Sequence, residues 1–159
     1  MKKIAWLLMF ATMVLVACKS SDSEINVTLN VKTFSFEQAG TRESSEFQYG
    51  ETIHILMELQ NNLAKDARLE FVSGQQFDIE VIDVNGERLW LWSSDKAFTQ
   101  ANSELILYSL ELSVLHEEGI NKDQDQYLPA GDYKIRAWLA NGKGNLAERS
   151  IKVLPETSL

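Results

Sequence analysis

Few side chains in this sequence have the type and spacing needed for metal binding. Its 159 residues include two histidines, His54 and His116, and a single cysteine, Cys18. His54 falls on the polar side of an alternating segment, and His116 stands at the entrance to a polar stretch. A zinc site needs three or four ligands at suitable spacing, and no third ligand accompanies either histidine. We therefore predict no metal role for them.

The Ser73-Gly74 pair is the candidate for a catalytic nucleophile. A serine nucleophile needs a neighbouring base and a sharp turn that presents it. Ser73 lies between strand-like segments, nothing marks a base for it, and the pattern G-x-S-x-G is absent. The phosphate-loop, dinucleotide and H-E-x-x-H patterns are absent as well. We expect no enzyme, and we interpret Ser73-Gly74 as a turn or a bulge.

An acidic stretch offers the one candidate cation site. Asn121, Asp123 and Asp125 fall at positions 1, 3 and 5 of a calcium-loop pattern, and Asp132 falls at position 12. Such loops carry glycine at position 6 and a bidentate glutamate at position 12. Gln126 occupies position 6, and no helices are expected on either side. A solvated polar loop without a metal is the preferred interpretation, with calcium binding as the alternative.

The N-terminal residues have the organisation of an export signal. Lys2 and Lys3 precede Ile4 to Val16, an apolar run of 13 residues. This run is shorter than the roughly 20 residues that span a bilayer, and it fits the core of a signal peptide. Ala17 and Cys18 follow this run.

The tetrapeptide Leu15-Val16-Ala17-Cys18 resembles the lipobox of bacterial lipoproteins. The resemblance implies cleavage between Ala17 and Cys18, with diacylglycerol on the thiol and an acyl chain such as palmitate on the new amine. Two or three such chains anchor a protein durably. We expect a signal peptide at 1–17, a lipidated cysteine with a polar tether at 18–24, and one domain at 25–159.

This organisation predicts a place in the cell envelope. Lys19, after the cysteine, is not the aspartate that retains such proteins at the inner membrane, so the periplasmic face of the outer membrane is favoured in a diderm cell. Without Lys2 and Lys3 the 15 basic residues become 13, against 23 acidic, a net charge of −10. Nucleic acid is excluded as a partner, because it binds clustered basic residues.

Beyond the tether, apolar and polar residues alternate with the period of two that is typical of strands. Strand-like segments lie at 25–36, 53–59, 69–71, 77–81, 89–92, 106–114, 133–139 and 146–154. The first changes parity near Lys32 and Thr33, which predicts a bulge or a break. Polar loops are expected at 37–50 and 116–126. The pattern predicts an all-β, immunoglobulin-like antiparallel sandwich of seven to eight strands.

Two short stretches of this pattern invite local predictions. Asn85-Gly86 is expected to form a two-residue hairpin turn, beside which Asp83 is a turn neighbour. Residues 95–101 could form one helical turn capped by Ser94 or Asp95. Trp90 and Trp92 would share one face of a strand, where core packing is the preferred role and a binding platform the alternative.

Several motifs in order along residues 47–154 resemble the BsuPI-type intracellular proteinase inhibitor domain. They are Gly50-Glu51, Asn61-Asn62, Ser73-Gly74-Gln75, Phe77-Asp78, Gly86, Trp90-x-Trp92-Ser93, Phe98-x-Gln100-Ala101 and Leu128-Pro129-Ala130-Gly131-Asp132-Tyr133. The resemblance implies an immunoglobulin-like sandwich and a proteinase partner. Asn102-Ser103-Glu104 departs from the Pro-Gly-Glu-like turn expected there, and the lipobox departs from an intracellular location.

The sequence thus predicts a lipid-anchored envelope protein that contacts the membrane through its lipid and binds a protein, as a proteinase inhibitor or another binding module. The alternative is a non-inhibitory structural or assembly sandwich that pairs an edge strand or loop with its partner. The candidate inhibitory loops are Glu37 to Gly50, Asp95 to Ser103 and His116 to Leu128, and the sequence does not choose among them.

Overall fold

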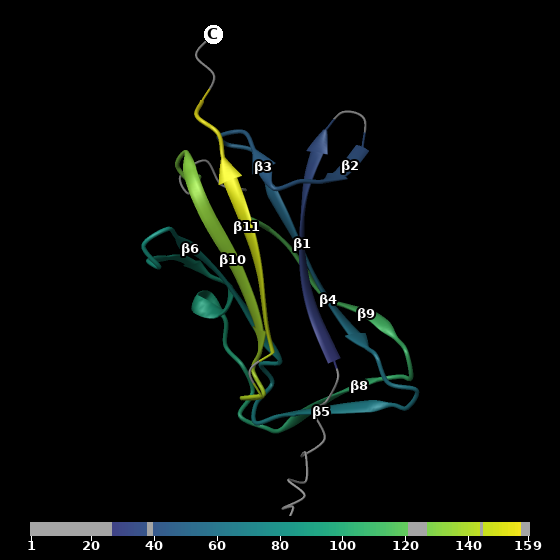
Figure 1. Cartoon of the computed structure of the whole chain (residues 1–159). Coiled ribbons are helices and arrows are strands. Elements are labelled where there is room, and N and C mark those ends of the chain that lie inside the picture. The colour runs from purple at the N-terminus through teal and green to yellow at the C-terminus, as the bar shows by residue number, and fades with distance from the viewer. Residues whose placement is uncertain (1–26, 38–39, 121–126, 144, 157–159) are drawn as a thin grey trace, which may run out of the picture.

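The computed structural model describes residues 27–37, 40–120, 127–143 and 145–156, which form eleven strands and one 3-10 turn (Figure 1). The elements are β1 (Val27–Glu37), β2 (Gly40–Glu43), β3 (Glu46–Phe47), β4 (Ile53–Asn61), β5 (Ala67–Phe71), β6 (Phe77–Asp83), β7 (Arg88–Leu91), η1 (Trp92–Asp95), β8 (Ser103–Leu107), β9 (Leu112–Ile120), β10 (Gly131–Leu139) and β11 (Leu146–Val153). Among these residues there is no helix long and apolar enough to cross a membrane.

The strands form two packed sheets and a short ribbon. One sheet has the order β2-β1-β4-β9 and the other the order β3-β11-β10-β6-β7, while β5 and β8 pair separately. All pairs are antiparallel except β3 with β11. Figure 1 shows the β5–β8 ribbon at the end of the sandwich where β1 begins. The prediction of an all-β, immunoglobulin-like sandwich is confirmed, with more strands than the seven or eight expected.

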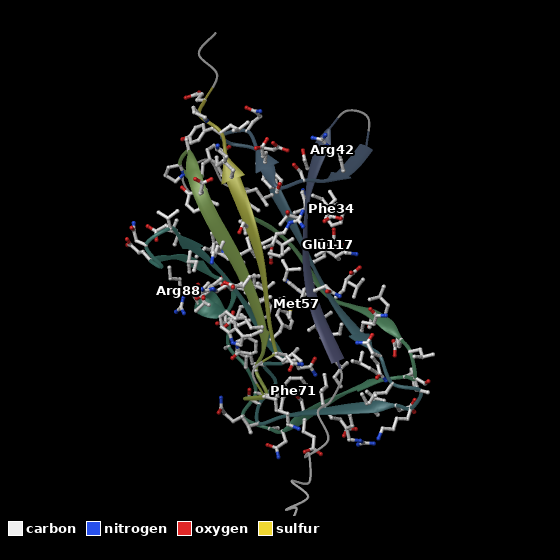
Figure 2. The ribbon with its side chains drawn as sticks, in the orientation of Figure 1. Phe34, Arg42, Met57, Phe71, Arg88 and Glu117 are labelled. Carbon is white, nitrogen blue, oxygen red and sulfur yellow. The ribbon has the colours of Figure 1, made fainter. Side chains whose placement is uncertain are left out.

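The core lies between the sheets, and strand periodicity fills it. In β4 the residues Ile53, Ile55, Met57 and Leu59 are fully buried, because every second side chain of a strand points to the same face. Ile135 of the opposite sheet is buried as completely. Figure 2 shows Met57 between the two sheets. Many aliphatic side chains of this kind make the sandwich stable.

The expected bulge or break in the first strand is wrong. β1 pairs with β4 without a register shift from Val27 to Phe34. Thr33 and Ser35 stay on the buried face, whereas Phe34 is half-buried on the other. Their hydroxyls donate hydrogen bonds to the Ser44 carbonyl and the Glu51 carboxylate. These bonds compensate for the loss of water, so polar residues occupy positions where the pattern predicted apolar ones.

The stretch at 37–50 is not a simple polar loop, since β2 pairs back on β1 and β3 pairs with β11. Phe47 of β3 is only 1% exposed. A two-residue strand with one buried aromatic ring is too short to show a period, which explains why the sequence pattern missed it.

The alternating segment 106–114 is not one strand. β8 ends at Leu107, β9 begins at Leu112, and Leu110 between them has a positive φ of 58°. The apolar residues of the alternation point outward, while Leu107 is buried. The exposed residues are Ile106, Tyr108, Leu110, Leu112 and Val114. Period two identified strand conformation but did not identify which face is buried.

The turn between β6 and β7 differs from the predicted two-residue turn. The amide of Gly86 donates to the carbonyl of Asp83, so Val84 and Asn85 are its central residues. Gly86 follows with a φ of +83°. The Asp83 carboxylate accepts bonds from the amides of Asn85 and Glu87, both at 2.8 Å. Asp83 therefore organises the turn, as its interpretation as a turn neighbour implied.

The motif before β10 forms a tyrosine corner. The hydroxyl of Tyr133 donates to the carbonyl of Pro129 at 2.7 Å. A side chain at Gly131 would place its Cβ 3.3 Å from that hydroxyl oxygen, closer than most such contacts. Tyrosine corners of this kind are a hallmark of immunoglobulin-like sandwiches. The glycine and the tyrosine are thus needed together.

Candidate functional site

The segment 96–102 connects η1 to β8 and lies outside regular secondary structure. Six of its seven residues are exposed, and Lys96 has extended dihedral angles, φ −110° and ψ 148°. The helical turn predicted for 95–101 is therefore wrong, because the 3-10 turn ends at Asp95. We call residues 96–102 the clamped loop, for the contacts that hold its two ends.

The Ser73-Gly74 turn holds the second half of the clamped loop. The Gly74 amide donates to the Thr99 carbonyl at 2.9 Å, and the Ser103 hydroxyl donates to the Ser73 carbonyl at 2.7 Å. A Cβ at position 74 would lie 2.6 Å from Thr99 Oγ1. Ser73-Gly74 is a turn, as expected, and its glycine allows the loop to approach.

A buried carboxylate supports the first half of the loop. Asp78 is 5% exposed. It accepts hydrogen bonds from the hydroxyl of Ser93, from Gln75 Nε2 at 3.0 Å and from the Ile79 amide at 2.9 Å. A buried carboxylate is tolerated only when its oxygens are satisfied in this way. The network ties β6 to η1, from which the clamped loop departs.

An aromatic cluster lies under the clamped loop. The ring of Trp92 packs on Phe77 at a centroid distance of 4.3 Å and on Phe98 at 5.8 Å. The ammonium of Lys96 lies 4.7 Å from the centre of the Trp92 ring and donates to the Trp92 carbonyl at 2.7 Å. Trp92 therefore fixes two residues of the loop by stacking and by a cation–π contact.

The two tryptophans of the Trp-x-Trp motif do not share a strand, because β7 ends at Leu91 and Trp92 begins η1. Both pack partly buried against the core. The preferred packing role is therefore right. Trp92 also supports the exposed loop, and the alternative role of a binding platform stays a prediction.

His116 joins this cluster from the opposite sheet. It lies within β9 and not at a loop entrance, and its ring centre is 4.8 Å from that of Phe77 and 5.1 Å from that of Trp92. Burial lowers the pKa of His116, and the nearby carboxylate of Glu118 opposes that shift less strongly. His116 Nε2 has no hydrogen-bond partner among the described residues and lies 3.6 Å from Glu118 Oε2. The geometry therefore favours a neutral, packed histidine.

A groove opens beside the cluster, between the edge strands β7 and β9 of the two sheets. Its volume is about 910 Å³. The lining includes Trp90, Trp92, Lys96, Glu118 and Tyr127. The groove thus combines aromatic rings with charged side chains of both signs.

The other predicted sites are placed only in part. Cys18 and Ala17 lie outside the described residues, as do positions 121–126 of the calcium pattern, while Asp132 lies in β10. Within the described ranges no three His, Cys, Asp or Glu side chains are grouped as a metal site. His54 lies half-buried in β4.

The sequence identified these motif residues but did not show that they support the same loop. Gly74, Gln75, Asp78, Ser93 and Phe98 all hold the clamped loop or the turn before it. No signal in the sequence showed that Asp78 is buried, since in the alternating pattern it shares the polar face of its strand with Glu80. A buried carboxylate is costly unless it is paired. The loop's own exposure could not be deduced from the sequence pattern.

Comparison with protein families gives one match. The family described as BsuPI, intracellular proteinase inhibitor, matches residues 41–144. This span includes the clamped loop and its supports. No curated protein matches the chain.

Comparison with solved structures gives distant similarities. A β-glucosidase from Listeria innocua in complex with isofagomine has a TM-score of 0.43 and 12% identity over 84% of this chain and 17% of its own. The alkylpurine DNA glycosylase AlkC of Pseudomonas fluorescens has 0.42 and 11% over 82% of this chain and 31% of its own. Similarity at this level says nothing about what this chain binds.

Proposed function

The chain belongs to the BsuPI family of intracellular proteinase inhibitors, and we propose that it is a lipid-anchored envelope protein that binds a serine proteinase through the clamped loop. The family supplies the proteinase partner. The loop assignment rests on one observation, that six of the seven residues 96–102 are exposed while the scaffold holds the loop on both sides.

Of the parts of the three candidate loops that the structure describes, residues 96–102 have the geometry that an inhibitor needs. β2 and β3 occupy six of the 14 residues in the stretch 37–50, and residues 116–120 belong to β9. The clamped loop belongs to no strand, and six of its seven residues are exposed.

The clamps supply the physical reason for tight binding. A loop held in one conformation loses less conformational entropy when it binds, so more of the contact energy contributes to affinity. Disulfides often hold such loops, but Cys18 is the only cysteine, so this chain forms no internal disulfide. Gly74, Asp78 and Trp92 would take over that role through hydrogen bonds and packing.

The lipid anchor is supported by the N-terminal sequence, in which Lys2, Lys3, the apolar run and Cys18 stand in the order of a lipoprotein signal. It would place the inhibitor domain at a membrane of the cell envelope. Mass spectrometry of the N-terminal peptide should find Cys18 as the first residue, carrying diacylglycerol. An unmodified Cys18, or a peptide that retains Ala17, would contradict the anchor.

The inhibitory activity is tested with the intact protein purified from membranes in detergent. We expect it to slow a serine proteinase when added in stoichiometric amounts and to survive uncleaved. Rapid digestion without inhibition would refute this function. In-cell crosslinking would then reveal whether an assembly partner, the alternative function, binds in its place.

A matched pair of substitutions tests the loop assignment. Ala97 lies in the clamped loop and Ala130 in the turn before β10, and both are exposed. Ala97→Asp should weaken inhibition at least tenfold, whereas Ala130→Asp should leave it unchanged, because only the first places a charge in the contact. Equal effects, or a larger effect at Ala130, would move the contact away from residues 96–102.

A further inference from the structure

Five exposed apolar residues follow one another along the chain from β8, through the turn, into β9. We call this set the apolar corner. Its side chains are 39% to 66% exposed: Ile106 39%, Tyr108 66%, Leu110 65%, Leu112 56% and Val114 59%. Large apolar side chains that are exposed in number along one short segment are candidates for a contact surface. The clamped loop uses none of these residues.

The apolar corner lies beside the point where the described chain begins. Val27, the first residue of β1, pairs with Asn61 at the end of β4, and the adjacent Gln60 pairs with Leu112. Figure 1 shows the start of β1 and the β5–β8 ribbon at the same end of the molecule, with the C-terminal end of β11 at the opposite end. The start of β1 and the apolar corner thus lie at the same end of the molecule.

Chain length limits how far this end can be from a membrane anchor. Eight residues, 19–26, separate Cys18 from Val27. Even a fully extended chain of that length spans only about 30 Å. If Cys18 carries lipid, the apolar corner is therefore held within reach of the bilayer surface.

The backbone amides at the tip of the corner have their partners within the molecule. The amide of Tyr108 donates to Glu111 Oε2 at 2.6 Å, and that of Ser109 donates to Asp66 Oδ1 at 3.0 Å. The amides of Leu110 and Glu111 donate to the carbonyls of Leu63 and Tyr108. All four consecutive amides are satisfied inside the molecule, which the apolar part of a bilayer interface requires.

We propose that the apolar corner rests on the lipid surface to which Cys18 is anchored, with Tyr108 and Leu110 entering the interface. The proposal rests on the lipid anchor of the proposed function. Tyrosine suits this depth, since its ring is apolar and its hydroxyl reaches water or headgroups. Interfacial segments of this type enter about 5–10 Å into the boundary between headgroups and acyl chains.

The attraction would be apolar and not electrostatic. The chain without its signal has 13 basic and 23 acidic residues, so anionic headgroups do not attract it as a whole. Contact through the corner should therefore persist at high salt, unlike binding through a basic patch.

The test places a fluorescent reporter in the corner of the intact, membrane-purified protein. Tyr108→Trp exchanges one exposed aromatic ring for another, and Val84→Trp places the same reporter in the β6–β7 turn, where the side chain is 76% exposed. Both proteins are incorporated in vesicles of phosphatidylethanolamine and phosphatidylglycerol, with and without brominated acyl chains. We expect the added emission of Tyr108→Trp to shift to the blue and to be quenched several-fold more steeply than that of Val84→Trp.

A second variant shows whether the apolar side chains cause the contact. Leu110→Asp in the Tyr108→Trp background should abolish the excess quenching, and the fold should tolerate it because aspartate accepts a positive φ better than leucine does. Equal quenching at positions 108 and 84 would overturn the proposal, as would a blue shift of Tyr108→Trp that depends on protein concentration without vesicles, which would indicate a second copy.

Mass spectrometry of Cys18 on the same samples separates this proposal from the lipid anchor. If Cys18 is lipidated but position 108 shows no excess quenching, the lipid anchor is supported and the membrane contact of the apolar corner is refuted. If Cys18 is unmodified but position 108 shows vesicle-dependent quenching, the membrane contact of the apolar corner is supported and the lipid anchor is refuted.

Discussion

At the scale of single residues, a glycine and a histidine show how closely the clamped loop and the aromatic cluster under it are packed. Gly74 lets the clamped loop lie against its turn, where a Cβ would meet Thr99 Oγ1 at 2.6 Å. His116 fills the space between the sheets under Trp92. Each makes a measurable prediction.

We expect Gly74→Ala to displace the clamped loop more than it destabilises the domain. The added methyl group must push Thr99 aside, at a cost of about 1 kcal/mol, and it weakens the bond from the amide of residue 74 to the Thr99 carbonyl. Limited proteolysis should cut 96–102 faster in the variant. Gly86→Asn is the control, because position 86 is open and asparagine tolerates its φ of +83°. An unchanged cleavage rate in Gly74→Ala would show that the turn does not hold the loop.

His116 should make stability depend on pH near neutrality. Because burial lowers its pKa from the ordinary value of 6.5, the unfolded chain takes up a proton more readily than the folded one. Stability therefore falls as the pH drops below about 6.5 and levels off below the folded-state pKa. The lowered pKa values of the Asp83 and Glu148 carboxyls act at lower pH.

Urea denaturation of the protein at about pH 7.5 and about pH 5.5 measures this dependence in the range where histidine titrates. His116→Phe keeps a ring in the cluster. It should reduce the difference between the urea midpoint at about pH 7.5 and the midpoint at about pH 5.5. His54→Gln serves as the control for the other histidine. A pH dependence that is the same in His116→Phe as in the parent protein would assign it to other groups.

At the scale of elements, the end of β4 organises the apolar corner. Asn61 is fully buried, and its Nδ2 lies 2.8 Å from the Lys65 and Tyr108 carbonyls and 3.1 Å from that of Leu107. Its Oδ1 accepts a bond from the Leu63 amide. One side chain thus joins the loop after β4 to the turn after β8, where strand pairing has ended.

Asn61→Ala should lower the free energy of unfolding by about 2 kcal/mol, because buried carbonyls lose their donor. Lys65→Ala, at an exposed position of the loop after β4, should change it by less than about 0.5 kcal/mol. Chemical denaturation of both variants measures the difference. If the two substitutions had equal effects, Asn61 would not be the link between the two loops.

At the scale of the whole molecule, the core lies between the two sheets, and no internal disulfide adds to its stability because Cys18 is the single cysteine. Ile135 in β10 and Ile106 in β8 both belong to alternating apolar segments, but the first is fully buried and the second is 39% exposed. The same alternating pattern therefore contributes different amounts to the free energy of unfolding in the two strands.

Truncation of these two isoleucines should separate their roles. Ile135→Ala should cost about 3 kcal/mol through lost burial and a new cavity, and Ile106→Ala about 0.5 kcal/mol. Thermal or urea unfolding gives the comparison. A large loss in Ile106→Ala would mean that the apolar corner is buried in solution, against another surface of the protein.

Much of the fold could be predicted because strand periodicity is a local property. The segments containing Ile53–Leu59, Phe77–Val81 and Tyr133–Leu139 are strands as expected. Errors arose where a distant partner decides the outcome. Thr33 stays buried because the Ser44 carbonyl accepts its hydroxyl, and β3 exists because β11 pairs with it.

The sequence by itself determined the all-β class, the family motifs and the lipoprotein-like N-terminus, since these depend on residue type, period and spacing. Only the tertiary structure decided that Ser73-Gly74 and Asp78 hold residues 96–102, and that the apolar row from Ile106 to Val114 faces outward. The physical reason is that a period of two states that side chains alternate but not which side meets the other sheet, and that the contacts of a loop come from strands distant in the chain.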